Sequence, residues 1–419
     1  MAFTDSRNLA VRFLVIAPHL APDTAPTGVV VSALVTEMAA AGHQVHVVTS
    51  LPWYKKHAVD PDWKGRGWRQ HGEFAGATVT RCYPFPSAKS NLLGRAMGFI
   101  GFTGLATLAS VFTRKRFDAV LAVSPPLTLG LAGWVAARRH RCPLIFNIQD
   151  VFPDVAIEVG ALTSKPAIRF FKGLERFCYR RAQTVAVLSD DLAANVAAKV
   201  GTGGPPVAVI PNFVDTTAIT PQDRVTDYRT EHGLGERTVV MYAGNLGHSQ
   251  SLNLMVETAR RHQNRTDVIY VINGDGVAAA ELKAAAASLP NLVMVGYQSA
   301  DRLSEVLASA DLHLVLLRKG LGASSVPSKM YSILAAGRPI VASIDPDSEV
   351  TRVLGEVQAG LSVPPEDPEA FVAAVEQLLD DPQLRQEMGQ AGRNWVKQWP
   401  TATQIAQKYQ ELAKGLAKG

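Results

Sequence analysis

The chain has 419 residues, of which 47% are hydrophobic and 19% charged, so it is neither disordered nor small enough for a single hydrophobic core. Its three cysteines, Cys82, Cys142 and Cys178, form no CxxC pair, which argues against a disulfide framework or a zinc knuckle and fits a reducing compartment. Residues 1–200 hold 23 Lys and Arg against 13 Asp and Glu (net +10), whereas residues 201–419 hold 19 against 24 (net −5). This asymmetry predicts two domains with different partners, and the basic half is either a solvated surface or a face for anionic lipid, nucleic acid or phosphorylated substrates.

The first half of the chain alternates between apolar runs and helical stretches. Residues 11–18 predict a buried strand, a helix follows that stops at Gly42, and residues 44–50 predict the next strand, which makes a right-handed βαβ unit. Residues 1–13 contain an acid and no apolar core of signal-peptide length, so a cytoplasmic protein is expected. Further strands are predicted at 118–126, 142–150, 184–191 and 206–215.

The stretch 96–112 is apolar, contains several glycines and threonines, and is followed by the basic residues 114–116. A membrane-spanning helix needs about 20 mostly apolar residues, so this shorter stretch argues against a span. One interpretation is a core helix. The other is a helix that rests on a membrane with its basic end at the lipid headgroups.

The second half repeats the scheme after a polar linker at 221–227. Its predicted strands are 238–245, 268–276, 292–297, 312–317 and 338–343. The predicted fold is therefore α/β, with two Rossmann-like, doubly wound domains that face a cleft. In open α/β sheets the ligand lies beyond the carboxyl ends of the strands, so we expect the site in that cleft.

A short helix with a lysine in its first turn is predicted in the second half. Ser325 fits an N-cap, Pro327 fits a first turn and Gly337 fits the position after the last turn, so a helix from about Val326 to Ala336 is expected. The unpaired N–H groups of a first turn attract anions, and a cation beside them costs about 0.3–1 kcal/mol. Lys329 is therefore interpreted either as a ligand of a bound phosphate or as a solvated lysine whose stem packs on its neighbours.

Glycines follow predicted strands near Gly28 and Gly244, where they permit tight turns and close approach of a ligand to the backbone. Asn245, beside the second of these, can hydrogen-bond a phosphate or a sugar. Residues 273–279 also match the dinucleotide fingerprint GxGxxA. The acid that such a site needs about 20 residues later is missing, which argues against a dehydrogenase.

Carboxylates and one histidine are the candidates for reaction chemistry. Asp150 ends an apolar strand, where a half-buried carboxylate can accept a proton or orient a sugar hydroxyl. Asp154 is interpreted as a helix cap, and His19, which follows the first strand, is either structural or part of the site. The Asp-Pro-Asp triplets at 60–62 and 345–347 could bind a metal ion, but such triplets are typical of turns.

Together these stretches resemble the retaining GT-B glycosyltransferases of family four. The family's motifs are matched in order and spacing by PTG (26–28), AAGHQVHVVTS, VIPNFVD (209–215), YAGNLG, INGDG and LAAGRPIV. The resemblance runs from about Arg12 to Trp399. A narrower resemblance, to the colanic-acid-type, fucosaminyltransferase-like branch, is carried by residues 51–86, 123–133, 149–162 and 326–331.

Three departures from the family pattern shift the roles that the resemblance implies. The two family glutamates correspond to Ser324 and Ser332, so donor ribose binding through the second glutamate is not expected. The family's basic pair after the glycine loop is replaced by Asn245 and polar residues near Gln250. The family's histidine at the end of the catalytic strand is Gln149 here.

The resemblance then implies that Lys329, with Arg318, faces the diphosphate of the donor, and that Asp150 lies beside the acceptor. The catalytic candidates are Asp150 and Lys329, and the acceptor-side candidates are His19, Gln149 and Asp150. The candidate donor-binding residues are Gly28, Gly244, Asn245, Gly274, Tyr297, Arg318, Ser325, Ser328, Lys329 and Ser332.

The implied activity is transfer of a sugar from a UDP- or GDP-sugar to a lipid-linked or otherwise membrane-held saccharide in cell-surface polysaccharide biosynthesis, without a metal or another cofactor. Residues 1–215 would bind the acceptor and residues 216–399 the donor, with a C-terminal helix at about 400–419 packed back on the first domain. The expected location is cytoplasmic and peripheral to the membrane, with no nucleic-acid partner. A catalytically inactive nucleotide-sugar-binding subunit and a GT-B-like nucleotide-sugar 2-epimerase are the alternatives.

Overall fold

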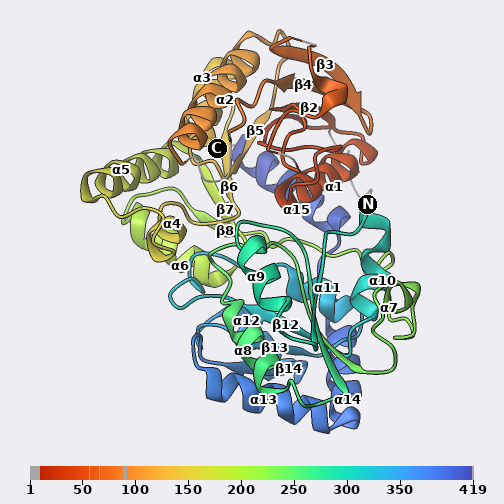
Figure 1. Ribbon diagram of the computed structural model, residues 1–419. Coiled ribbons are helices and arrows are strands. Elements are labelled where there is room, and N and C mark those ends of the chain that lie inside the picture. Colours follow the sequence, from red (N-terminus) through yellow and green to blue (C-terminus); the bar gives the residue numbers. More distant parts are fainter. Residues whose placement is uncertain (1–9, 56, 66, 88–91, 418–419) are drawn as a thin grey trace, which may run out of the picture. The chain divides into compact units, whose positions relative to one another are not determined.

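The computed structural model describes residues 10–55, 57–65, 67–87 and 92–417; residues 1–9, on which the expectation of a missing signal peptide largely rests, lie outside the described residues. The chain forms two compact units (Figure 1). Unit 1 comprises Met1–Pro153, Ser164–Asn212 and Ala402–Gly419, and unit 2 comprises Asp154–Thr163 and Phe213–Thr401. The chain therefore passes from one unit to the other four times.

Unit 1 is built on an eight-stranded sheet. Its strands are β1 (Arg12–Ile16), β2 (Gln44–Ser50), β3 (Arg69–Phe74), β4 (Ala77–Cys82), β5 (Ala119–Ser124), β6 (Leu144–Ile148), β7 (Thr184–Val187) and β8 (Val207–Val209). They lie in the order β3-β4-β2-β1-β5-β6-β7-β8, and all neighbours are parallel except β3, which runs antiparallel to β4. The strands of the centre are continuous apolar runs because helices cover both faces of the sheet.

The helices of unit 1 include the last helix of the chain. They are α1 (Pro26–Ala40), α2 (Leu92–Phe112), α3 (Leu129–His140), α5 (Lys165–Arg181), α6 (Asp190–Val200) and α15 (Ala402–Ala417), with a 3₁₀ turn, η1, at Pro61–Trp63. Figure 1 shows α2 and α3 on one side of the sheet and α1 and α15 on the other. Tyr409 on α15 is buried and accepts a hydrogen bond of 2.8 Å from Asn147 Nδ2 on β6. Helix α15 therefore completes the core beside β6, the strand that precedes Gln149 and Asp150.

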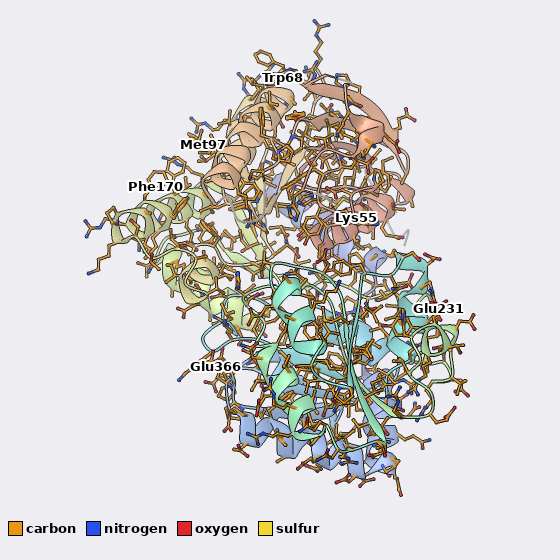
Figure 2. All side chains as sticks on the ribbon, viewed as in Figure 1. Lys55, Trp68, Met97, Phe170, Glu231 and Glu366 are labelled. Carbon is orange, nitrogen blue, oxygen red and sulfur yellow. The ribbon has the colours of Figure 1, made fainter. Side chains whose placement is uncertain are left out.

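Helix α2 has one buried and one exposed apolar face. Its Gly94–Phe112 stretch is long and apolar enough to cross a membrane by length and composition, and 33% of the tested stretch is buried. Phe102, Ala106 and Ala109 pack inward, so the core-helix interpretation describes only this face. The exposed residues Met97, Ile100, Leu108 and Phe112 keep between 53% and 71% of their surface accessible. Figure 2 shows Met97 projecting outward from α2, as Phe170 does from α5.

Unit 2 is built on a six-stranded, fully parallel sheet. Its strands are β9 (Thr238–Ala243), β10 (Val268–Asn273), β11 (Leu292–Val295), β12 (Leu312–Leu316), β13 (Ile340–Ser343) and β14 (Gly360–Val363), in the order β11-β10-β9-β12-β13-β14. Its helices are α4 (Asp154–Glu158), α7 (Asp227–Glu231), α8 (Asn253–Arg261), α9 (Ala279–Ala286), α10 (Leu303–Ala308), α11 (Lys329–Ala335), α12 (Glu349–Val357), α13 (Pro368–Asp380) and α14 (Pro382–Val396), with a 3₁₀ turn, η2, at Ala300–Arg302. Alternate residues of β9 enter different cores, Val239 and Met241 on one face and Val240 and Tyr242 on the other.

Three strands are absent from the sequence-based prediction. The β3–β4 hairpin gives a weak sequence signal, because β3 has few apolar residues and is mostly exposed. Strand β14 also gives a weak signal, because it has only four residues, two of them partly buried and one exposed. The predicted helix at Val326–Ala336 is also too long. It begins at Lys329, with Ser328 as its N-cap. A proline disfavours helical dihedrals in the residue before it, which accounts for the position of Val326 outside the helix. Gly337 takes the predicted role after the last turn, with φ of 68°.

Candidate functional site

The loop after β9 packs directly on the loop after β10. The Gly244 N–H donates to the Asn273 carbonyl at 2.9 Å, and Gly244 has a φ of 144°, which suits glycine. A Cβ added to Gly274 would lie 1.9 Å from the Gly244 oxygen, and one added to Gly276 would lie 2.2 Å from the Leu246 oxygen. The glycines of the GxGxxA match are thus required by contact between two loops, and the space over them is filled by protein backbone rather than open to a dinucleotide.

Lys329 points its ammonium group at this pair of loops. Its Nζ lies 3.6 Å from the centre of the Tyr242 ring, and a Cβ added to Gly244 would be 3.2 Å from Nζ. The Nζ atom is buried and has no hydrogen-bond partner among the residues that the structure describes. The Tyr242 hydroxyl is already committed, since it donates to the Asn245 carbonyl at 2.8 Å. The stem of Lys329 therefore does not lead into solvent, and the solvated-lysine interpretation is wrong.

Burial lowers the pKa of Lys329 to about 7, because the charged form loses its hydration and no neighbouring carboxylate replaces it. A cation over an aromatic face gains roughly 0.5–2 kcal/mol, which is less than a lost solvation shell of an ammonium ion costs. Burial, with a smaller contribution from the charge of Lys329, lowers the pKa of His313, on β12, to about 4. The charged form of Lys329 is therefore destabilised in the unliganded protein, and an anion placed beside Nζ would stabilise it.

Among the other donor-side candidates, the glycines have the clearest contacts. Gly244 and Gly274 touch each other, and Gly244 touches Lys329. The Arg318 N–H donates to the Ser249 carbonyl at 2.9 Å, which joins the loop after β12 to the loop after β9. The positions of the others are as follows: Asn245 and Ser328 are exposed, Ser325 and Ser332 are half-buried, and Tyr297 keeps 51% of its surface accessible.

The helix dipole contributes less than predicted. Helix α11 has seven residues, its N-cap is Ser328 rather than Ser325, and the Ser328 side chain caps no N–H group. Gln250, near the place of the missing basic pair, folds back onto its own loop by accepting from the Gly247 N–H at 2.9 Å. Lys329, and not Gln250, therefore places a basic group against the glycine loop after β9.

The Asp-Pro-Asp triplets act as turns. Asp345 accepts from the N–H groups of Gly320 (3.0 Å) and Gly322 (2.9 Å) and so shapes the loop that leads to Lys329. Asp60 accepts from the Asp62 N–H at 3.1 Å and caps η1. Within the described ranges, no group of three or more His, Cys, Asp and Glu side chains is placed to hold a metal ion.

In unit 1, Gln149 is the centre of a side-chain network at the end of β6. Its Nε2 donates to Asn147 Oδ1 at 2.7 Å and its Oε1 accepts from Asn212 Nδ2 at 2.8 Å. Both the nitrogen and the oxygen of the Gln149 amide are therefore hydrogen-bonded inside unit 1, so Gln149 links Asn147 to Asn212. Asp150 follows it, half-buried, two residues after β6.

His19 is paired with a carboxylate that the sequence-based analysis did not single out. Its Nδ1 lies 2.7 Å from Asp23 Oδ2, and the two side chains are only 11% and 3% exposed. Gly28 is buried against this loop, since an added Cβ would lie 2.9 Å from the His19 Cβ. Gly28, predicted on the donor side, therefore has an observed role in packing α1 against the loop after β1.

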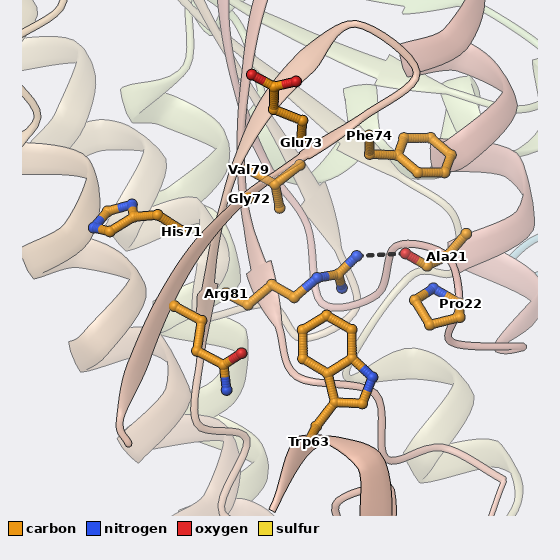
Figure 3. Close-up of a pocket in the computed structure, with 10 residues that line it drawn as sticks. Ala21, Pro22, Trp63, His71, Gly72, Glu73, Phe74, Val79 and Arg81 are labelled. Carbon is orange, nitrogen blue, oxygen red and sulfur yellow. Dashed lines mark hydrogen bonds between the residues drawn. The ribbon is translucent and has the colours of Figure 1, made fainter. Parts of the chain in front are cut away.

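The same loop forms one wall of a pocket of about 340 Å³. Ala21 and Pro22 line it from the loop, Trp63 from η1 and Arg81 from β4 (Figure 3). Arg81 donates to the Ala21 carbonyl, and its guanidinium lies 5.0 Å from the centre of the Trp63 ring. Gln70 Nε2, at the wall of the pocket, is buried with no hydrogen-bond partner among the described residues.

Family models assign most of the chain. The model of the glycosyl transferase 4-like domain matches residues 27–212, and the model of glycosyl transferases group 1 matches residues 225–395. The chain belongs to the GT-B glycosyltransferases of family four. It is an enzyme of the glycosyltransferase class, and the two models meet close to the boundary between units 1 and 2.

Known relatives of this family-four glycosyltransferase cover nearly its full length. WcaI of Escherichia coli (strain K12), named for colanic acid biosynthesis, is 26% identical over 88% of this chain and 92% of its own. Sucrose-phosphate synthase of Thermosynechococcus elongatus has the same fold, with a TM-score of 0.76, 16% identity and coverage of 97% and 99%. HepE of Anabaena, solved with UDP-glucose, superposes with a TM-score of 0.71, 14% identity and coverage of 97% and 100%.

Sequence reasoning missed three residues that hold candidate site residues in place. Tyr242 lies under Lys329, Asp23 holds His19, and Asn212 holds Gln149. A signal existed for the first two: Tyr242 is the strand residue two positions before Gly244, and Asp23 stands four residues after His19 in a short loop. Asn212 is 63 residues from its partner, and no local pattern connects the two.

Proposed function

We propose that this glycosyltransferase moves a sugar from a UDP- or GDP-sugar, bound by unit 2, to a saccharide on a membrane-held lipid carrier, recognised by unit 1, in the assembly of a cell-surface polysaccharide. The observation that carries the donor half is Lys329, whose buried and unpaired ammonium group lies against the glycine loop after β9. The likeness to WcaI, named for colanic acid biosynthesis, and to HepE, solved with UDP-glucose, supports the substrate classes.

In this mechanism Lys329 faces the diphosphate of the donor. When the bond between the sugar and the diphosphate breaks, negative charge develops on the diphosphate oxygen, and a fixed ammonium group in a dry site stabilises that charge. We propose that this lysine makes an added divalent ion unnecessary and that the configuration at the sugar carbon is retained. Transfer in the presence of EDTA tests the first statement, and NMR of the product linkage tests the second.

The first experiment incubates the purified protein with UDP- and GDP-sugars and bacterial lipid extract, and follows nucleoside diphosphate release by mass spectrometry. Release that depends on the extract is expected and would identify the donor at the same time. Saturable nucleotide binding without release from any donor would contradict the transferase and favour a nucleotide-sugar-binding subunit, with Ser324 and Ser332 in the places of the family glutamates as the reason.

We also propose that unit 1 contacts an anionic membrane through α2 from the cytoplasmic side. The exposed apolar residues of α2 are followed by Arg114, Lys115 and Arg116, all exposed, which is the combination that binds an interface. All three cysteines are free thiols, which fits a reducing compartment.

A vesicle experiment tests this membrane contact. The double variant Met97→Ser, Phe112→Ser should sediment less with vesicles of phosphatidylglycerol than the unchanged protein does, because both side chains are exposed and contribute apolar area to the interface. The control Val225→Ser removes an equally exposed apolar side chain from unit 2 and should change nothing. Equal sedimentation of all three proteins would contradict the role of α2.

A further inference from the structure

The pocket of unit 1 lies on one face of the β3–β4 hairpin and reaches the carboxyl edge of the sheet. Gln70 of β3 is paired with Arg81 of β4, and Gly72 with Val79, so these four positions share that face. The Arg81 guanidinium donates to the Ser50 carbonyl at the end of β2 (3.2 Å), a strand that runs parallel to β4. This end of the pocket is therefore at the edge where open α/β sheets bind their ligands.

Gly72 leaves the pocket open in the middle of a strand. A Cβ added to Gly72 would meet no atom within 4 Å, and its φ is not positive. The backbone therefore does not require a glycine here, and what the missing side chain provides is space. The volume of about 340 Å³ lies within the range of about 300–1,000 Å³ that small-molecule sites occupy.

The lining combines apolar rings with few polar groups. Trp63 and Phe74 are half-buried, and Pro22 completes the apolar side. Figure 3 shows the Trp63 ring beside the Arg81 guanidinium, whose central carbon lies 5.0 Å from the ring centre. A sugar ring has the matching composition, because one face of it carries C–H groups and its rim carries hydroxyl groups.

The polar groups of the lining have hydrogen-bond donors to spare. A guanidinium has five N–H groups, and within the described part of the chain three of those of Arg81 donate to the carbonyls of Leu20, Ala21 and Ser50. The Nε–H and one Nη2–H remain. Gln70 Nε2 is buried without a hydrogen-bond partner among the described residues. Since Gln70 is half-buried at the pocket wall, a rotation of its amide can offer this donor to a ligand.

The charges around the pocket favour a neutral ligand. Burial lowers the pKa of Arg81 to about 10 and attraction from Asp23 raises it, so the guanidinium stays charged at neutral pH with a carboxylate nearby. Glu73 adds a second carboxylate to the lining. Both carboxylates repel a phosphate or another anion, whereas a hydroxyl group can accept from Arg81 at no such cost.

We infer that this pocket is a saccharide subsite, in which one neutral sugar ring of the acceptor packs on Trp63 while its hydroxyl groups accept hydrogen bonds from Arg81 and Gln70. The subsite is complete within unit 1 and takes no part in making or breaking bonds. The inference rests on the proposed function for the identity of the acceptor, and it adds the place where unit 1 holds the acceptor saccharide.

The first test measures binding without a donor. Mild acid releases saccharides from the diphosphate carriers of a bacterial lipid extract, and saturation-transfer NMR detects those that bind the full-length protein. Binding should disappear in Gly72→Leu, whose side chain fills the pocket, and weaken in Gln70→Leu, which keeps the size of the side chain. The control Gly415→Leu adds the same side chain at an exposed glycine of α15 with equally open surroundings, and it should bind as the unchanged protein does. Excess inorganic phosphate should not displace the saccharide.

The second test measures kcat and acceptor KM separately, with the donor identified above and intact lipid extract as the acceptor. Gly72→Leu should raise acceptor KM by about tenfold or more, and Gln70→Leu by about 2- to 10-fold, the usual effect of one lost hydrogen bond. In both variants kcat should stay nearly unchanged, because a contact made equally in the ground state and the transition state affects KM alone. A normal kcat at saturating acceptor also shows that unit 1 is folded.

Three results would overturn the inference: no saccharide binding by the unchanged protein, displacement of the saccharide by phosphate, or an unchanged acceptor KM in Gly72→Leu. A lower kcat with unchanged KM would overturn it as well, because the pocket would then act in the reaction. If thermal unfolding shows that Gly72→Leu does not fold, Gln70→Leu carries the test, and its unchanged KM overturns the inference. A wild-type protein without transfer would overturn the proposed function, and the NMR experiment, which needs no donor, would still decide whether the pocket binds a saccharide.

Discussion

The loop after β1 in unit 1 and the loop after β9 in unit 2 each follow a central strand of their sheet, yet the ionisable side chains beside them differ in their partners. In unit 1, His19 has Asp23, and Arg81 has three backbone carbonyls. In unit 2, the Nζ of Lys329 has an aromatic face and no hydrogen-bond partner among the described residues. The comparison shows that the loop after β1 is held by its own protein partners, whereas the loop after β9 faces a buried amine whose free-energy cost a bound anion would remove.

The largest effect is expected from the unpaired lysine. Lys329→Met keeps most of the length of the side chain and removes its charge, so turnover should fall by about 10²- to 10³-fold, as it does when one fixed donor to a developing oxyanion is removed. Steady-state transfer assays measure this loss. Lys283→Met, which removes an exposed lysine on α9, is the matched control. Turnover within a factor of two of the unchanged protein would show that the two loops do not differ in the way described.

The second effect concerns pH. Burial lowers the pKa of Lys329 to about 7, so the free protein carries a neutral amine above that pH, and a facing diphosphate raises the pKa again. UDP binding should therefore take up a proton, and affinity should fall by up to about tenfold per pH unit between about pH 7 and pH 9. His313, with a pKa of about 4, stays neutral over this range.

Calorimetry in two buffers of different ionisation enthalpy measures that proton uptake. In Lys329→Met the affinity should be weak and should not follow this pH dependence. A pH-independent affinity of the unchanged protein, without proton uptake, would mean that Lys329 does not face the diphosphate.

The smallest effect is on stability, and its sign should differ between the two loops. Lys329→Met should stabilise the unliganded protein by about 1–3 kcal/mol, because it removes a buried polar group without a partner. Arg81→Met should destabilise it by a similar amount, about 1–3 kcal/mol, since its three carbonyl acceptors lose their donor.

Thermal unfolding without ligand distinguishes these outcomes. The folded pKa of Lys329 lies below its ordinary value of 10.5, so the unfolded chain binds more protons between about pH 7 and 10.5 and stability rises with pH there. The gain in Lys329→Met should accordingly be largest below pH 7 and disappear toward pH 10.5. A gain of the same size at every pH would point to packing rather than to charge.

Hydrophobic runs and the turn residues that bound them were enough to predict the central strands of both sheets, because a continuous apolar run between turns has few alternative structures. The same signals predicted Gly337 after α11 and the glycine loop after β9. They could not predict β3, whose residues are mostly polar, or the hydrogen-bond partner of His19, which depends on how one short loop folds back on itself. These sequence signals also could not predict the orientation of the Lys329 side chain, since a lysine can extend into solvent or over an aromatic ring.

Residues 154–163 illustrate the same limit at a larger scale. They follow β6 directly along the chain, but Val155 and Val159 pack into a core cluster of unit 2. Nothing in their local pattern distinguishes an excursion of this kind from an ordinary turn and helix.

The position of α15 has a consequence for synthesis on the ribosome. Chains generally fold from the N-terminus as they emerge, but Tyr409, which closes the core against Asn147 of β6, is made more than 250 residues after its partner. The unit that begins first is therefore the last to be completed, and unit 2 can assemble entirely while unit 1 still lacks a helix. A nascent chain released just before residue 402 would carry a finished unit 2 attached to an open sheet in unit 1.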